Sequence, residues 1–153
     1  MRIDRNQPFV ILMAEDDADD RLLTSEALAD IRNFNALEFV EDGFELLEYL
    51  HSEGDYADSP RALPNLILLD LNMPRMSGLE ALARIKQDAR LRLIPVVVLS
   101  TSNSEADVAN SYALGAASYL TKPTSYRGMV KLMKVLSRYW FEYVELPVEP
   151  HPC

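Results

Sequence analysis

Short, continuous apolar runs alternate along the chain with segments whose apolar residues recur every three or four positions. The runs are typical of parallel strands covered on both faces, and they lie at residues 9–14, 36–40, 66–70, 96–100 and 118–122. The periodic segments predict helices from Asp19 to about Asn33, around 46–50, from Ser77-Gly78 onward, from about 105 to 114, and around 129–136. The polar stretch between them at 51–64 is predicted to be a loop.

Five strands that alternate with five helices favour a parallel sheet, because each right-handed crossover lays its helix across one face. We therefore predict an α/β fold: a flavodoxin-like, doubly wound, five-stranded parallel sheet with strand order 2-1-3-4-5 and helices on both faces. In such sheets functional groups gather at the carboxyl ends of the strands, near the point where strand order reverses. Polar residues at those ends are the candidate functional residues.

The predicted strand ends carry acidic, hydroxyl and ammonium groups. Glu15 and Asp16 follow the first strand, and the later strands end at Asp70, Ser100 and Lys122. Crowded carboxylates raise one another's pKa unless a cation offsets them. With only oxygen ligands and no cysteine or histidine nearby, the predicted ion is Mg²⁺, held by Glu15, Asp16 and Asp70. Carboxylates, hydroxyl and ammonium together indicate a phosphoryl site in which Asp70 is the nucleophile and acceptor.

Composition and charge limit the class of protein. At 153 residues, with 48% hydrophobic and 25% charged residues, the chain fits one compact domain. Its formal net charge of −9 repels a phosphate backbone, so nucleic acid is not an expected partner. No apolar run approaches the roughly 20 residues that cross a bilayer, and the polar start lacks a signal-peptide core, so we expect a cytoplasmic protein without membrane contact. The single cysteine, Cys153, excludes an intramolecular disulfide and a cysteine metal cluster.

Four motifs, taken in order, resemble the receiver domains of two-component response regulators. They are "AEDD" at 14–17, "LLDLNMPRMSG" at 68–78, "VVLSTS" at 97–102 and "YLTKP" at 119–123. The resemblance covers about residues 8–138. It implies a receiver domain over that range and a C-terminal extension at 139–153.

The resemblance also implies a role for each matching residue at the metal and phosphoryl site. Asp16 would bind the metal directly, whereas Glu15 would act mostly through water. Asn72 would offer its backbone carbonyl to the metal, and Asp70 would be the phosphoacceptor. Lys122 would pair with the phosphoryl group.

Two further matches concern the response to phosphorylation. Ser100 resembles the switch hydroxyl of the family. The neighbouring residues Thr101 and Ser102 also carry hydroxyls, but we choose Ser100 because its separation of 22 positions from Lys122 fits the family pattern. Tyr119 resembles the aromatic residue that changes rotamer when this hydroxyl moves. We therefore expect the readout surface on the helix at about 105–114, the fifth strand and the last helix.

The implied function is that of a single-domain response regulator, which is not an enzyme but supports its own phosphotransfer and slow dephosphorylation. Its partners would be a sensor histidine kinase and an unidentified downstream protein, because few residues follow Lys122 and no output domain is expected. Two alternatives stay open. One is a receiver-like interaction module that never accepts phosphate; the other is an aspartate-nucleophile phosphatase, although Asn72 stands where such an enzyme needs a second acid.

Acidic residues at a helix start are common without any functional role, because they complement the positive end of the helix dipole. We apply this interpretation to Asp17, Asp19 and Asp20.

The C-terminal extension is too apolar for a solvated tail. Its apolar residues are Tyr139, Trp140, Phe141, Tyr143, Val144 and Leu146. We interpret it as a homodimer arm that extends the last helix to about residue 147 and is followed by a flexible tail; alternatively, it packs back on its own domain. The segment resembles the single-domain regulators that work with phytochrome-type histidine kinases, which predicts a phytochrome-type photoreceptor as the kinase.

Overall fold

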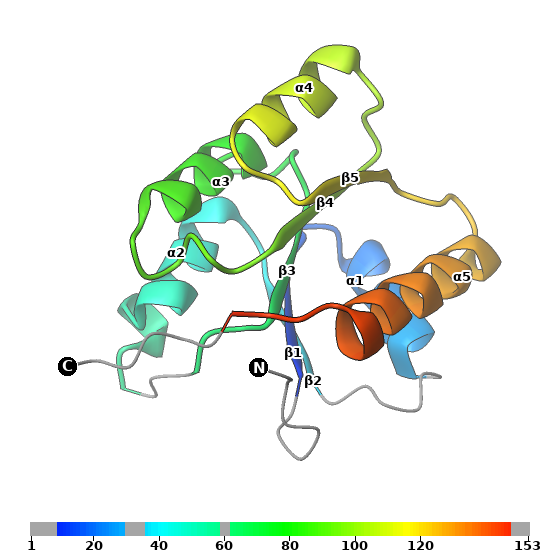
Figure 1. Ribbon diagram of the computed structural model, residues 1–153, viewed down its shortest axis with the longest axis horizontal. Helices are drawn as coiled ribbons and strands as arrows, with labels where there is room; N and C mark the ends of the chain where they lie inside the picture. Colours follow the sequence, from blue (N-terminus) through cyan, green and yellow to red (C-terminus); the bar gives the residue numbers. More distant parts are fainter. Residues whose placement is uncertain (1–8, 30–35, 59–61, 148–153) are drawn as a thin grey trace.

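The computed structural model describes residues 9–29, 36–58 and 62–147, which form one parallel sheet flanked by helices (Figure 1). The strand order is β2-β1-β3-β4-β5, as predicted. The strands are β1 (Val10–Ala14), β2 (Ala36–Val40), β3 (Leu66–Leu69), β4 (Val96–Ser100) and β5 (Ser118–Thr121). The third and fifth strands end one residue earlier than expected, so Asp70 and Lys122 lie just beyond the sheet.

The five expected helices are present and cover both faces of the sheet. They are α1 (Ala18–Ala29), α2 (Gly43–His51), α3 (Gly78–Gln87), α4 (Glu105–Ala113) and α5 (Tyr126–Ser137). Figure 1 shows α1 and α5 together on one face and α2 and α3 on the other. The expected end of the first helix at Asn33 lies outside the described residues, and the expected loop contains a short 3-10 turn, Gly54–Tyr56. No helix in the described ranges has the length and apolarity needed to span a membrane.

Side-chain caps fix where most of these helices begin. A polar residue in extended conformation precedes each of four helices, and its side-chain oxygen accepts a hydrogen bond from the backbone N–H three residues later. These caps are Asp42, Ser77, Ser104 and Ser125. Such a bond satisfies one of the free N–H groups at a helix start and typically stabilises the helix by about 1 kcal/mol.

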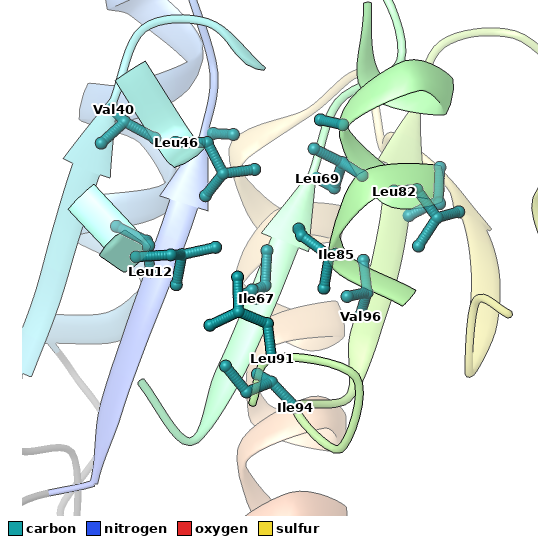
Figure 2. Close-up of a cluster of buried hydrophobic side chains, with 14 of the residues drawn as sticks. Leu12, Val40, Leu46, Ile67, Leu69, Leu82, Ile85, Leu91, Ile94 and Val96 are labelled. Atoms are coloured by element: carbon teal, nitrogen blue, oxygen red, sulfur yellow. The ribbon is translucent and has the colours of Figure 1, made fainter. Parts of the chain in front are cut away.

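The sheet buries both of its faces, which explains the continuous apolar runs. Leu12 and Ala14 of β1 point into a core under α2 and α3, whereas Ile11 and Met13 point into a second core under α1 and α5. The same alternation holds along β3 and β4. Figure 2 shows the first of these cores, which contains strand residues such as Ile67 and Val96 together with helix residues such as Leu82 and Ile85. Because both faces are buried, the polar groups of this sheet are found at its ends.

The C-terminal extension continues α5 as a π-helical segment, Arg138–Tyr143. Trp140 is buried, and the rings of Phe141 and Phe9 have centroids 3.9 Å apart. Val144 and Leu146 are half-buried against the same core. Of the two interpretations of the extension, packing on its own domain is therefore the one that applies to Trp140, Phe141, Val144 and Leu146. The expected flexible tail beyond residue 147 lies outside the described residues.

Two aromatic side chains of the extension remain exposed. Tyr139 is 55% exposed and Tyr143 is 67% exposed. Val135, one turn before Tyr139 in the last helix, is also exposed. Of the residues expected in a dimer arm, only these two tyrosines present most of their surface to solvent.

Candidate functional site

Three carboxylates meet at the carboxyl end of the sheet. Glu15 and Asp16 follow β1, and Asp70 follows β3. Backbone hydrogen bonds continue past the strand ends, since the N–H of Asp70 donates to Ala14 at 3.1 Å and that of Glu15 donates to Val40 at 2.9 Å. As a result, one carboxylate oxygen from each of Glu15, Asp16 and Asp70 lies within 4.8 Å of the others.

Burial makes Glu15 costly to ionise. Glu15 is fully buried and Asp70 is 6% exposed, whereas Asp16 is exposed. Burial, together with the charge of Asp70, raises the pKa of Glu15 from 4.5 to about 7, although the hydrogen bond from Lys122 lowers it. Because this pKa of about 7 already includes the effect of Lys122, Glu15 is only partly ionised at neutral pH.

Lys122 contributes a positive charge to this cluster. Its Nζ donates to Glu15 at 2.5 Å, to Asp20 at 3.0 Å and to Asp70 at 3.2 Å. Burial alone would lower the pKa of Lys122, but its hydrogen bonds to Glu15 and Asp20 and the charge of Asp70 raise it. The lysine is thus charged in the folded protein and bridges the ends of β1, β3 and β5.

Asp20 corrects the sequence interpretation of the acidic helix start. The interpretation fits Asp17, whose side chain accepts from the backbone N–H of Asp19 at 2.8 Å and of Asp20 at 3.2 Å. It is wrong for Asp20, whose carboxylate contacts Lys122. Acidic composition at a helix start does not distinguish a capping residue from one that faces the site.

The cluster fits a hard divalent cation. Oxygen ligands gathered within a few ångströms of one another are what Mg²⁺ and similar ions require, and three carboxylates with one lysine leave an excess of negative charge. Glu15, Asp16 and Asp70 would hold such an ion. The backbone N–H of Asn72 donates to Asp70 Oδ1 at 3.2 Å, which places Asn72 beside the cluster; its carbonyl as a further ligand stays a prediction.

Ser100 and Tyr119 are linked through the loop after β4. Ser100 is fully buried, and its Oγ accepts from the backbone N–H of Ser102 at 3.2 Å. The hydroxyl of Tyr119 donates to the Ser102 carbonyl at 2.7 Å. The Ser102 hydroxyl in turn donates to Asp107 of α4 at 2.6 Å. Ser102 therefore connects the expected switch residues to α4, a connection that the sequence pattern did not reveal.

Contacts at Gly78 and Arg75 hold the loop that follows Asp70. Gly78 approaches the Asp70 backbone so closely that a Cβ atom would lie 2.2 Å from the Asp70 carbonyl oxygen, so only glycine fits there. Arg75, in the left-handed region with φ of 62°, donates from Nε to Asp42 Oδ2 at 2.7 Å. Burial would raise the pKa of Asp42, but its hydrogen bonds to Arg75 and to the Glu45 N–H lower it overall.

Divalent-metal affinity is expected to rise with pH. The metal competes with the proton that Glu15 retains until about pH 7, so the affinity at pH 8 should exceed that at pH 6 by about tenfold. In the metal-free protein the folded state binds more protons than the unfolded state between pH 4.5 and about 7, so stability should fall as pH rises through that window. Calorimetric titration with the divalent metal at several pH values measures the rise in metal affinity. In the variant Glu15→Gln, whose amide does not titrate, the metal affinity should depend less on pH. An unchanged pH dependence in that variant would contradict the role of Glu15 in this effect.

Comparisons with known proteins agree with this geometry. The family described as "Response regulator receiver domain" matches residues 11–134. Response regulator Rcp1 of Synechocystis sp. is 43% identical over 147 residues, covering 96% of this chain and 99% of Rcp1. A probable methanogenesis regulatory protein of Methanothrix harundinacea, FilR2, is 35% identical, covering 95% of this chain and 92% of that protein.

Solved structures give the same result. The phosphorylated cyanobacterial phytochrome response regulator RcpA has a TM-score of 0.86 at 40% identity, covering 93% of this chain and all of that one. The Mn²⁺-bound form of Rcp1 has a TM-score of 0.83 at 43% identity, covering 92% of this chain and all of that one. On the matched motifs, the fold and these similarities, the chain belongs to the response regulator receiver domain family.

Proposed function

We propose that the protein accepts a phosphoryl group on Asp70 from a sensor histidine kinase, with Mg²⁺ held by Glu15, Asp16 and Asp70. The observation that carries this proposal is the buried Asp70 carboxylate, which lies among two other carboxylates and the Lys122 ammonium at the end of the sheet. An oxygen of Asp70 forms the new bond to phosphorus as the bond from phosphorus to the kinase histidine nitrogen breaks. The bound metal would neutralise charge on the phosphoryl oxygens.

Residues of the chain orient and neutralise the reacting groups. The Asn72 N–H and the Lys122 Nζ each donate to a different oxygen of Asp70, at 3.2 Å in both cases, so the carboxylate is held in one orientation. After transfer, the lysine can pair with the phosphoryl oxygens, because its contact with Asp70 already places it at the acceptor. The same residues would support slow loss of the phosphoryl group to water.

Phosphorylation would be read out through Ser100 and Tyr119. A phosphoryl group adds between one and two negative charges and three acceptor oxygens. If Ser100 turns its hydroxyl toward them, the Ser102 N–H loses its acceptor, and the Tyr119 and Asp107 contacts of Ser102 rearrange with it. Helix α4, β5 and α5 are therefore the proposed signalling surface.

Ser100→Ala should separate phosphorylation from response. The variant keeps Asp70 and the carboxylate cluster, so it should still take up phosphoryl from a small phosphodonor. It lacks the hydroxyl that engages the phosphoryl group, so hydrogen exchange in residues 102–119 should no longer change on phosphorylation. A full change in exchange in the variant would contradict the role of Ser100.

A phytochrome-type histidine kinase is the proposed phosphodonor, and the support is similarity to RcpA and Rcp1 over nearly the whole chain. Phosphotransfer to this protein from a purified, labelled phytochrome-type kinase is expected to be faster than from kinases of unrelated sensors. Equal or slower transfer would contradict the phytochrome assignment while leaving the acceptor chemistry intact.

The proposal also includes a cytoplasmic location and a downstream partner that is a protein and not nucleic acid.

Homodimer formation through the C-terminal extension is also part of the proposal. It rests on the exposed side chains of Tyr139 and Tyr143, because the other apolar residues of the extension are wholly or partly buried in the domain core. Substituting both tyrosines by Ser should convert a dimer to a monomer in light scattering without unfolding the domain. Exposed Tyr112→Ser in α4 is the matched control. An unchanged mass in the double variant would contradict this interface.

A further inference from the structure

The lysine of the site has one acidic partner that lies outside the metal cluster. Lys122 Nζ carries three N–H donors, and each has a carboxylate acceptor: Glu15, Asp70 and Asp20. Two of these acceptors also belong to the group of carboxylates that can hold a metal ion, whereas Asp20 does not. The lysine and a bound metal would therefore compete for Glu15 and Asp70 but not for Asp20.

This competition has an electrostatic cost. A divalent cation at Glu15 and Asp70 would lie close to the charged Lys122 ammonium, whose side chain is only 7% exposed and so poorly screened by water. Repulsion between the two cations weakens metal binding unless a further negative charge neutralises the lysine. Asp20, in the first turn of α1, supplies that charge at 3.0 Å.

We propose that Asp20 is a positioning residue that holds the Lys122 ammonium while Glu15 and Asp70 take up a divalent cation. The inference rests on the metal site of the proposed function and adds a fourth acidic residue to it. Asp20 keeps the lysine at the acceptor, and it lowers the effective positive charge that the incoming metal meets. Its backbone position is fixed by Asp17, whose side chain accepts from the Asp20 N–H, and by the α1 helix that follows.

The neighbouring residue provides a matched control. Asp19 carries the same charge in the same helical turn, is exposed, and makes no ion pair within the described part of the chain. Asp19→Asn and Asp20→Asn therefore remove equal charge from the same end of α1. Any effect of the helix dipole or of net charge is shared by the two variants.

The test is the affinity of the full chain for Mn²⁺, measured from the electron paramagnetic resonance signal of the free ion. Asp20→Asn should weaken binding by about tenfold, which corresponds to about 1.4 kcal/mol, whereas Asp19→Asn should weaken it by less than about threefold. Equal losses in the two variants would overturn the inference. Absence of Mn²⁺ binding by the unaltered protein would instead overturn the metal site itself, and the inference with it.

A second readout reports on the lysine directly. In protein labelled with ¹⁵N-lysine, the Lys122 ammonium signal, assigned with Lys122→Arg, should stay protected from solvent exchange when Mg²⁺ is added to the unaltered protein and to Asp19→Asn. In Asp20→Asn the signal should be lost to exchange on addition of Mg²⁺. A signal that stays equally protected in Asp20→Asn would show that the ammonium does not need Asp20.

Discussion

Asp70→Asn should abolish phosphoryl uptake and leave the fold intact. The amide cannot act as the nucleophile, and the other two carboxylates of the cluster, Glu15 and Asp16, have the proposed role of holding the metal. The amide keeps the shape of the side chain, and its one oxygen can still accept from either the Asn72 N–H or Lys122. The expected result is complete loss of the phosphoryl adduct in intact-mass spectrometry, with an unchanged circular dichroism spectrum.

Asp16→Asn distinguishes loss of the acceptor from loss of the metal. This variant keeps Asp70 but removes one of the three carboxylates that can hold the ion. Its phosphorylation should be slowed and should recover as the metal concentration is raised, whereas Asp70→Asn should not recover at any metal concentration. An adduct that persists in Asp70→Asn would show that another residue is the acceptor.

Lys122→Met should strongly destabilise the metal-free protein at pH 8. The lysine is 7% exposed and donates to three carboxylates, two of which are also buried. Removing one partner from a buried charge cluster typically costs about 3 kcal/mol or more, because the remaining charges are left uncompensated. Urea unfolding should show this loss at pH 8 and a smaller loss at pH 5, where Glu15, whose pKa is about 7, is protonated.

Two comparisons test the electrostatic origin of that loss. Lys131→Met removes a lysine from the exposed side of α5 and should change the free energy of unfolding by less than about 0.5 kcal/mol. Saturating Mg²⁺ should restore part of the stability of Lys122→Met, because the ion neutralises the same carboxylates. A loss of equal size at both pH values and unaffected by Mg²⁺ would point to packing of the lysine side chain instead.

The parts of the site that the sequence predicts are those set by the sheet. Continuous apolar runs identify the strands, and the carboxyl ends of parallel strands must meet at one edge, so Glu15, Asp16 and Asp70 were expected to converge. Lys122 follows from the same reasoning, because it comes directly after β5. These contacts depend on the order and register of the strands. The alternating pattern of strands and helices allows few other strand orders, so the sequence is enough to predict them.

The contacts that the sequence did not predict depend on which way a side chain leaves a helix or loop. Asp20 and Asp19 are identical in type and adjacent, yet only the first reaches Lys122 across the fold. Arg75 contacts Asp42 from a left-handed backbone position that its residue type does not announce. Ser102 contacts Ser100 and Tyr119 through its main-chain N–H and carbonyl, groups that do not depend on its residue type.

The aromatic extension shows a related difficulty. Apolar composition indicates that a segment is buried but does not identify the surface that buries it. Phe141 packs on Phe9, a residue at the opposite end of the chain, whereas Tyr139 and Tyr143 remain exposed. Packing on the domain and the proposed contact with a second chain therefore involve different residues of one segment, and the sequence pattern does not separate them.

Intact-mass spectrometry after incubation with a small phosphodonor and Mg²⁺ tests the acceptor chemistry most directly. The expected result is a single phosphoryl adduct that requires the metal, disappears with EDTA and maps to the peptide containing Asp70. No adduct under any metal condition, with the protein folded, would contradict phosphoryl acceptance and favour a receiver-like interaction module that works without phosphate.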